Sequence, residues 1–252
     1  MINLNRYLLL ITIILLIVTN KKCIEFFNYK YTPLMDDITT YTVNNKNKLF
    51  ILGSVHGNEP AGTDACKLLI KKLKNCKLKN GTLSIYTKPN PYGYNNNIRY
   101  QHTLLNRDIN RNYINNGRCN VSKFIIKNIK NYTKNDLIID LHEGYDYHKL
   151  NSNSVGSTII PLPNKFCINI ANKMVKKLND NIDEKHKKFT VLINDPNHND
   201  PYGSFRDWCL KNKKNYILVE LTGQNNKQHI NIRVNQNITL LIECLKSLIM
   251  IN

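Results

Sequence analysis

The stretch "LFILGSVHGNEPAG", residues 49–62, runs from an apolar segment through a polar turn into a second ordered segment. Its first five residues have the length and apolarity of a short buried strand. Residues 59–74 have helical spacing, and Pro60 suits the first turn of that helix. Glycines on both sides of His56 allow a tight turn between strand and helix, and Glu59 follows three residues later.

The same alternation of apolar runs and helical segments continues along the chain. Further strands are predicted at residues 82–89, 136–144, 157–161, 189–194 and 216–223. Further helices are predicted at residues 121–132, 165–179 and about 238–250, the first with Ser122 near its N-cap. Strands that alternate with helices predict an α/β fold with a mixed, mainly parallel sheet flanked by helices on both faces.

A single domain of ordinary size is expected from 252 residues with 42 % apolar content. We assign residues 48–252 to this domain and treat residues 23–47 as a polar N-terminal stretch. Residues 1–22 form a separate segment, because an uncharged run at residues 7–18 lies between one arginine and two lysines.

The N-terminal segment, residues 1–22, has two interpretations. Its uncharged run is shorter than the roughly 18 residues of a spanning helix, which favours a signal peptide. No small-residue cleavage site follows it and the trailing lysines resist translocation, so an uncleaved anchor stays open. A signal peptide predicts a protein of the secretory pathway, and an anchor predicts membrane association through residues 7–18.

The charge and cysteine content exclude some classes of function. The 36 Lys and Arg residues outnumber 18 Asp and Glu residues, so the formal charge is +18 and favours anionic partners. The basic residues are mostly lysines in polar runs such as residues 71–79, without the aromatic interleaving or motifs of nucleic-acid sites. No specific nucleic-acid binding is therefore expected. The seven cysteines include no C-x-x-C pair, which argues against a zinc ribbon, although one or two disulfides stay open.

Side chains that can bind metal follow three of the predicted strands. His56 and Glu59 follow the first, His142 and Glu143 end the strand at residues 136–144, and Glu220 lies near the end of the last. In open parallel sheets, ligands bind beyond the carboxyl ends of the strands. Imidazoles and carboxylates near a core must be paired, hydrated or bound to a metal. We therefore expect these side chains to meet at one edge of the sheet.

His56, Glu59 and His142 together form a donor set typical of catalytic zinc, which leaves a fourth position to water. Zinc can lower the pKa of a bound water to about 7, and a nearby carboxylate can then accept its proton. Glu220 is the candidate for that general base. The sequence thus predicts one zinc ion per chain and a hydrolase.

Six motifs carry a resemblance to a known family. In chain order they are "GSVHGNEPAG", "NPYGYNNNIRY", "NRDINRNY", "DLHEG", "YGSFRDW" and "VELTGQ". Between about residues 48 and 224 the chain resembles the zinc carboxypeptidase superfamily, including the aspartoacylase and succinylglutamate desuccinylase-like deacylases. Each motif is weak by itself, and their common order carries the resemblance. It implies the zinc carboxypeptidase-like fold.

The resemblance also implies roles for the strand-end residues. His56 and Glu59 match the first two zinc ligands, and His142 matches the third. Glu220 matches the general base that later protonates the leaving amine.

Further roles are implied for residues on the intervening loops. Asp108 matches the acid that orients a ligand histidine. Asn110 and Arg111 match the pair that binds the free carboxylate of the substrate. Arg99 matches the arginine that polarises the scissile carbonyl and stabilises the oxyanion, with Arg107 as a competing candidate.

The motifs also depart from the family pattern. One extra residue precedes Trp208, and the mobile tyrosine of the carboxypeptidases has no assigned counterpart. Arg206 has two interpretations. On the cavity wall it would favour an acidic substrate side chain, and otherwise it is a surface arginine.

The leading hypothesis is a metallocarboxypeptidase acting on a peptide with a free carboxylate. The first alternative is an aspartoacylase or succinylglutamate desuccinylase-like deacylase of small N-acyl amino acids. The second, from a different class, is a non-enzymatic binding protein that uses its basic surface.

Overall fold

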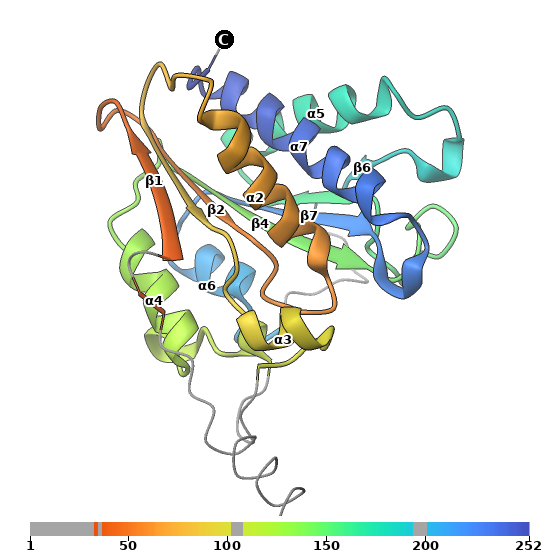
Figure 1. The fold of residues 1–252 in the computed structure, drawn as a ribbon, viewed down its shortest axis with the longest axis horizontal. Helices are drawn as coiled ribbons and strands as arrows, with labels where there is room; N and C mark the ends of the chain where they lie inside the picture. The colour runs from red at the N-terminus through yellow and green to blue at the C-terminus, as the bar shows by residue number, and fades with distance from the viewer. Residues whose placement is uncertain (1–32, 35–36, 102–107, 194–200, 252) are drawn as a thin grey trace, which may run out of the picture.

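Seven strands form one sheet in the order β1-β3-β2-β4-β7-β5-β6 (Figure 1). The computed structural model describes residues 33–34, 37–101, 108–193 and 201–251. The strands are β1 (Ile38–Thr42), β2 (Lys48–Leu52), β3 (Thr82–Tyr86), β4 (Leu137–Gly144), β5 (Thr158–Pro161), β6 (Thr190–Val191) and β7 (Tyr216–Thr222). The α-helices are α2 (Pro60–Leu73), α3 (Pro91–Asn96), α4 (Asn120–Ile129), α5 (Lys165–Asn179), α6 (Phe205–Lys211) and α7 (Ile230–Ser247).

The centre of the sheet is parallel. β3, β2, β4 and β7 run in one direction, whereas β1 is antiparallel to β3 and β5 is antiparallel to β7. β6 pairs in parallel with β5 at the far edge. All eight residues of β4 are buried, as expected of a central strand covered on both faces. The predicted mixed, mainly parallel α/β sheet is confirmed.

Helices cover both faces of this sheet. α2, α5 and α7 lie on one side, and α4 and α6 lie on the other (Figure 1). Because successive side chains of a strand point to opposite faces, β2 contributes to both cores. Leu49 and Ile51 pack with α2 and α7, while Phe50 and Leu52 pack with α4 and α6.

Several elements differ from their predicted extents. α7 begins at Ile230 rather than near residue 238. Its first turns were not predicted because they are rich in Asn, which has a low helix propensity. The predicted strand at 189–194 is reduced to Thr190–Val191. β1 lies within the stretch 23–47, where the sequence reading placed no strand, and α3 and α6 were also not predicted.

The N-cap of α4 is Cys119, and Ser122 lies near it, as predicted. Ser122 occupies the third helical position, where its side chain and that of Cys119 form a reciprocal capping box. The six described cysteines are free, and four of them are buried.

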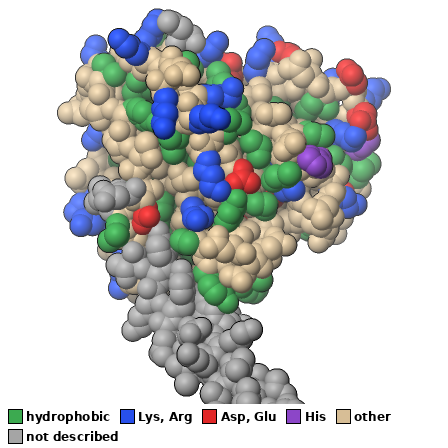
Figure 2. Space-filling model, viewed as in Figure 1, with side chains coloured by type: hydrophobic (Ala, Val, Ile, Leu, Met, Phe, Trp, Pro, Cys, Tyr) green, Lys and Arg blue, Asp and Glu red, His purple; other side chains and the backbone are tan. Residues whose placement is uncertain are grey.

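The segment predicted as a signal peptide or anchor, residues 1–22, lies outside the described residues. In the part of the chain that the structure describes, no helix combines the length and apolarity needed to cross a membrane. On the face shown in Figure 2, Lys and Arg side chains outnumber acidic ones, in keeping with the formal charge of +18.

Candidate active site

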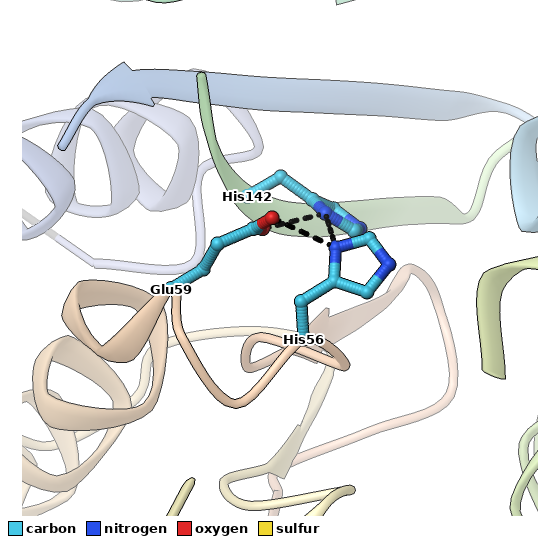
Figure 3. A group of neighbouring side chains, drawn as sticks. All are labelled: His56, Glu59 and His142. Atoms are coloured by element: carbon cyan, nitrogen blue, oxygen red, sulfur yellow. Dashed lines mark hydrogen bonds and ion pairs between the residues drawn. The ribbon is translucent and has the colours of Figure 1, made fainter. Parts of the chain in front are cut away.

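His56, Glu59 and His142 converge at the carboxyl ends of β2 and β4 (Figure 3). The Nδ1 atoms of the two histidines are 3.1 Å apart, and each lies 2.9 Å from one oxygen of Glu59. Zinc ligands at about 2.0–2.1 Å in a tetrahedral arrangement would be separated by about 3.3–3.4 Å. The three side chains are almost fully buried. Their spacing and chemistry therefore fit one small divalent cation.

The local backbone explains how a short turn delivers two of these donors. The chain leaves β2, places His56 in the loop and reaches Glu59, the N-cap residue of α2. A Cβ atom at Gly57 would overlap the backbone of Gly93 in α3, so only glycine lets this loop pack there. His142 comes from β4, whose parallel pairing with β2 sets the distance between the two histidines.

Each histidine directs its second ring nitrogen at a carboxylate. His56 Nε2 lies 3.1 Å from Asp108 Oδ1, and His142 Nε2 lies 3.3 Å from Asp140 Oδ1. Such partners fix the ring and direct the other nitrogen toward the metal position. Asp108 is held in turn at the start of a short 3-10 helix, where it accepts a hydrogen bond of 2.8 Å from the Asn110 amide.

Asp140 was missed by the sequence reading. The signal was present in "DLH", because residues two apart on a strand point to the same face. The Asp140 side chain is fully buried, and the Tyr216 hydroxyl donates a hydrogen bond of 2.7 Å to its other oxygen.

The charges of the site support one another. Burial opposes ionisation of Glu59, but His56 and His142 hold its pKa well below the usual value. Burial likewise opposes ionisation of Asp108, but His56 and Arg99 hold its pKa low. Burial lowers the pKa of His142, yet Asp140 and Glu59 outweigh it and raise that pKa. The carboxylates are thus kept in the ionised form that binds cations.

Glu220 lies on β7 directly opposite His142 in the register of the sheet. Its exposed fraction is 9 %, and it lines the same cavity as the histidines. Burial raises the pKa of Glu220 to about 8; His142 opposes this shift and the Glu59 carboxylate adds to it. A carboxyl group with a raised pKa is suited to proton transfer near neutral pH.

The predicted arginines and Asn110 also reach the cavity. Arg99 Nε donates to Asp108 Oδ2 at 3.1 Å, and its Nη1 lies 3.4 Å from Glu59 Oε1. Arg111 is exposed and donates to the main-chain oxygen of Asn110 at 2.7 Å. The Asn110 side-chain oxygen accepts from the Phe205 amide at 2.8 Å and so fixes the start of α6. The competing Arg107 lies outside the described residues.

The cavity has a volume of about 350 Å³. One wall is apolar and is formed by Val155, Ile160 and Leu218, while Arg206 lies on the lining as well. Arg206 Nη2 donates to the Pro161 oxygen at 3.2 Å. The cavity therefore combines donors for anions with an apolar surface beside the candidate metal position.

Gln224 is a second residue that the sequence reading did not assign, although it ends the motif "VELTGQ". Its Nε2 donates to Glu59 Oε1 at 3.0 Å and also to the main-chain oxygen of Glu143. Gln224 thus links β7 and β4 to the carboxylate of the candidate ligand.

The fold is the zinc carboxypeptidase-like one. The structure of apo cell shape determinant protein Csd4 from Helicobacter pylori matches with a TM-score of 0.68 at 16% identity, over 84% of this chain and 54% of that chain. The mDAP-bound form of Csd4, a D,L-carboxypeptidase, matches with a TM-score of 0.67 at 16% identity, over 84% and 54%. An aspartoacylase family protein from Mesorhizobium loti matches with a TM-score of 0.60 at 18% identity, over 85% of this chain and 62% of that chain. The chain thus spans 54% of the Csd4 chain length.

Residues 45–155 match the family model of the succinylglutamate desuccinylase/aspartoacylase catalytic domain. The matched segment contains His56, Glu59 and His142. No curated protein matches the chain by sequence. The resemblance to the zinc carboxypeptidase superfamily, with its aspartoacylase and succinylglutamate desuccinylase-like deacylases, is confirmed. The family model and the solved structures thus agree on the zinc carboxypeptidase-like fold.

Proposed function

We propose that this chain is a zinc-dependent hydrolase that cleaves an amide bond next to a free carboxylate, most simply a metallocarboxypeptidase. The observation that carries the proposal is the convergence of His56, Glu59 and His142 within 3.1 Å of one another. Two imidazole nitrogens and one carboxylate form a donor set that catalytic zinc sites use. We assign these three residues as the zinc ligands.

When bound, zinc supplies a Lewis acid that activates water near neutral pH. Glu220 is assigned as the general base and acid: it accepts a proton from the attacking water and later donates it to the leaving amine. Its pKa of about 8 suits both directions of transfer. Arg99, on the cavity wall beside Glu59, is placed to donate to the scissile carbonyl oxygen as negative charge develops there.

Substrate binding is assigned to Arg111 and Asn110. The Arg111 guanidinium is exposed at the cavity, and its planar fork matches a carboxylate in two parallel hydrogen bonds. Asn110 orients this arginine, because Arg111 Nη1 is bonded to the Asn110 main-chain oxygen. A substrate with a free carboxylate, either a peptide C-terminus or an N-acyl amino acid, fits this pair.

A deacylase of small N-acyl amino acids is the second candidate. The family model that covers residues 45–155 favours it, since that model describes succinylglutamate desuccinylase and aspartoacylase. The cavity of about 350 Å³ falls within the range of small-molecule sites. A non-enzymatic binding protein with a basic surface is the remaining alternative.

The deciding experiment combines metal analysis with an activity screen. Purified protein is expected to contain one zinc per chain. It should hydrolyse members of a C-terminal peptide panel or of an N-acyl amino acid panel, and chelation should abolish the activity. Selective hydrolysis of peptides supports the carboxypeptidase, and selective hydrolysis of N-acyl amino acids supports the deacylase. Bound zinc with no turnover on either panel would favour the binding protein, and absence of zinc would overturn all metal-dependent versions.

A further inference from the structure

Glu59 occupies a position where its side chain has two competing uses. It is the N-cap residue of α2, and a carboxylate there ordinarily accepts a hydrogen bond from the first amides of its own helix. In this protein Glu59 makes no such bond, because its side chain turns toward His56 and His142. The first amides of α2 therefore need another acceptor.

Glu143 supplies that acceptor from a different strand. Pro60 has no amide hydrogen, so the first N–H of α2 belongs to Ala61. The Ala61 amide donates to Glu143 Oε1 at 2.7 Å, in a buried position. The main-chain amide of Glu143 also donates to Glu59 Oε2 at 3.1 Å. Glu143 thus makes two contacts: its side chain accepts from the first amide of α2, and its main-chain amide donates to the Glu59 carboxylate.

Arg233 of α7 fixes the orientation of the Glu143 side chain. Its Nη1 is paired with Glu143 Oε2, and both side chains are almost completely buried. A Cβ atom at Gly223 would overlap Glu143 Oε2, so glycine leaves the room that this pair occupies. A buried ion pair adds little to stability compared with well-packed apolar side chains. A role in holding the Glu143 side chain in place would explain why this buried ion pair is present.

We propose that Glu143, fixed by Arg233, is a positioning residue that caps α2 in place of Glu59 and so leaves Glu59 directed at the metal. The inference rests on the metal centre of the proposed function. Without an acceptor at Glu143, the Ala61 amide would compete with the metal for the Glu59 carboxylate.

The test compares two double variants whose hydrogen-bonding capacity differs. E143M/R233M replaces the pair with apolar side chains and removes the acceptor for Ala61. E143Q/R233Q removes both charges but keeps the acceptor, since one amide oxygen can bind Ala61 while the two amides bond to each other. Asp64→Asn is the matched control, because Asp64 is a carboxylate of α2 that bonds to Tyr94 and Lys67 instead of Glu59.

The zinc dissociation constant of metal-free protein is measured by competition with a chromophoric chelator, beside thermal melting. E143M/R233M should bind zinc about 10–100-fold more weakly, as expected when a group that orients a ligand is lost. E143Q/R233Q and Asp64→Asn should remain within about threefold of the wild type, by the same reasoning. A folded E143M/R233M variant with wild-type affinity overturns the positioning role.

If E143M/R233M does not fold, E143Q/R233Q decides. The positioning role requires this variant to bind zinc nearly as the wild type does, and a tenfold or larger loss in the folded variant overturns it. Wild-type protein that binds no zinc overturns the proposed function itself. Failure of the positioning role alone therefore differs from failure of the metal centre.

Discussion

The two histidines of the candidate site are held in different ways. His56 lies on a loop, and its partner Asp108 sits on a second loop with 14% of its side chain exposed. His142 lies on the central strand β4, and its partner Asp140 is on the same strand and fully buried. We call these the loop half and the strand half of the site. In both halves a carboxylate faces the second imidazole nitrogen. Asp108 comes from a separate loop and is hydrogen-bonded to His56, whereas Asp140 comes from the same strand as His142 and lies at ion-pair distance from it.

This difference bears on energetics. Removing a partner from a buried network leaves the other groups unsatisfied and costs roughly 1–3 kcal/mol for each such group. A partly exposed group can bond to water instead, so the same change costs less. Substitutions in the strand half should therefore affect both metal binding and folding, whereas substitutions in the loop half should act mainly on the site.

The largest effect is expected from Glu220, which lies on β7 opposite His142 of the strand half and has the proposed proton-transfer role. Glu220→Gln should lower the rate of hydrolysis at least ~10²-fold, because the amide cannot accept a proton. Zinc should be retained, since Glu220 is not one of the three ligands. Steady-state rates and metal content of the same preparation provide the measurement.

The control for this variant is Glu184→Gln, which changes an exposed carboxylate paired with Lys187. It should leave the rate unchanged. Normal turnover by Glu220→Gln would mean that another group is the base, and loss of zinc from this variant would mean that Glu220 belongs to the metal set.

The second prediction compares Asp140→Ala with Asp108→Ala. Asp140→Ala should weaken zinc binding about 10–100-fold and also lower the free energy of unfolding, because it leaves the Tyr216 hydroxyl without its acceptor. Asp108→Ala should weaken zinc binding within the same range but lower the free energy of unfolding by less. Chelator competition and urea denaturation measure the two quantities. Equal losses of unfolding free energy in both variants would contradict the division into halves.

The sequence predicted the strand half only in part. "DLIIDLHEG" could be read as a buried strand because its apolar run is continuous, and His142 followed from its position at the strand end. Asp140 was missed because a lone acid inside such a run looks like part of the strand. The role of Asp140 becomes visible only through the hydrogen bond from the Tyr216 hydroxyl on β7. The sequence does not show that bond, because β4 and β7 are far apart in the chain.

The loop half was predicted more completely, because its residues form compact motifs. His56, Glu59 and Asp108 were identified from short spacings that resemble a family. The Glu143–Arg233 pair was not predicted, since it joins β4 to the early turns of α7. Those turns are rich in Asn and precede the helix predicted at about residues 238–250. Local patterns thus identify candidate ligands, while contacts between distant elements identify the groups that hold them.

The third prediction concerns Arg111, an exposed residue of the short 3-10 helix that follows Asp108 of the loop half. Arg111→Ala should lower kcat/KM by about tenfold for substrates with a free carboxylate, because a charge-assisted hydrogen-bond pair is worth at least ~1.5 kcal/mol. Zinc affinity and unfolding should not change. The measurement pairs each substrate with its carboxyl-amidated form.

An equal loss on the amidated substrate would argue against carboxylate binding by Arg111. Arg118→Ala is the matched control, since Arg118 is also exposed but does not line the cavity. It should leave kcat/KM unchanged for both forms of the substrate.

The last prediction isolates one hydrogen bond of the strand half by comparing two buried tyrosines of the same apolar cluster. Tyr216→Phe removes the donor to Asp140 and should lower the free energy of unfolding by about 1.5–3 kcal/mol, the usual range for bonds to charged groups. Tyr113 is the matched control, because within the described residues its buried hydroxyl has no hydrogen-bond partner.

Tyr113→Phe should therefore change the free energy of unfolding little, or raise it, because it removes a buried polar group that gains nothing from its surroundings. Urea denaturation of both variants at neutral pH gives the comparison, since each change deletes the same hydroxyl group. If both variants lost the same free energy of unfolding, the Tyr216 hydroxyl would contribute only through packing and not through its hydrogen bond. Asp140 would then hold His142 without support from β7, and the strand half would be no better anchored than the loop half.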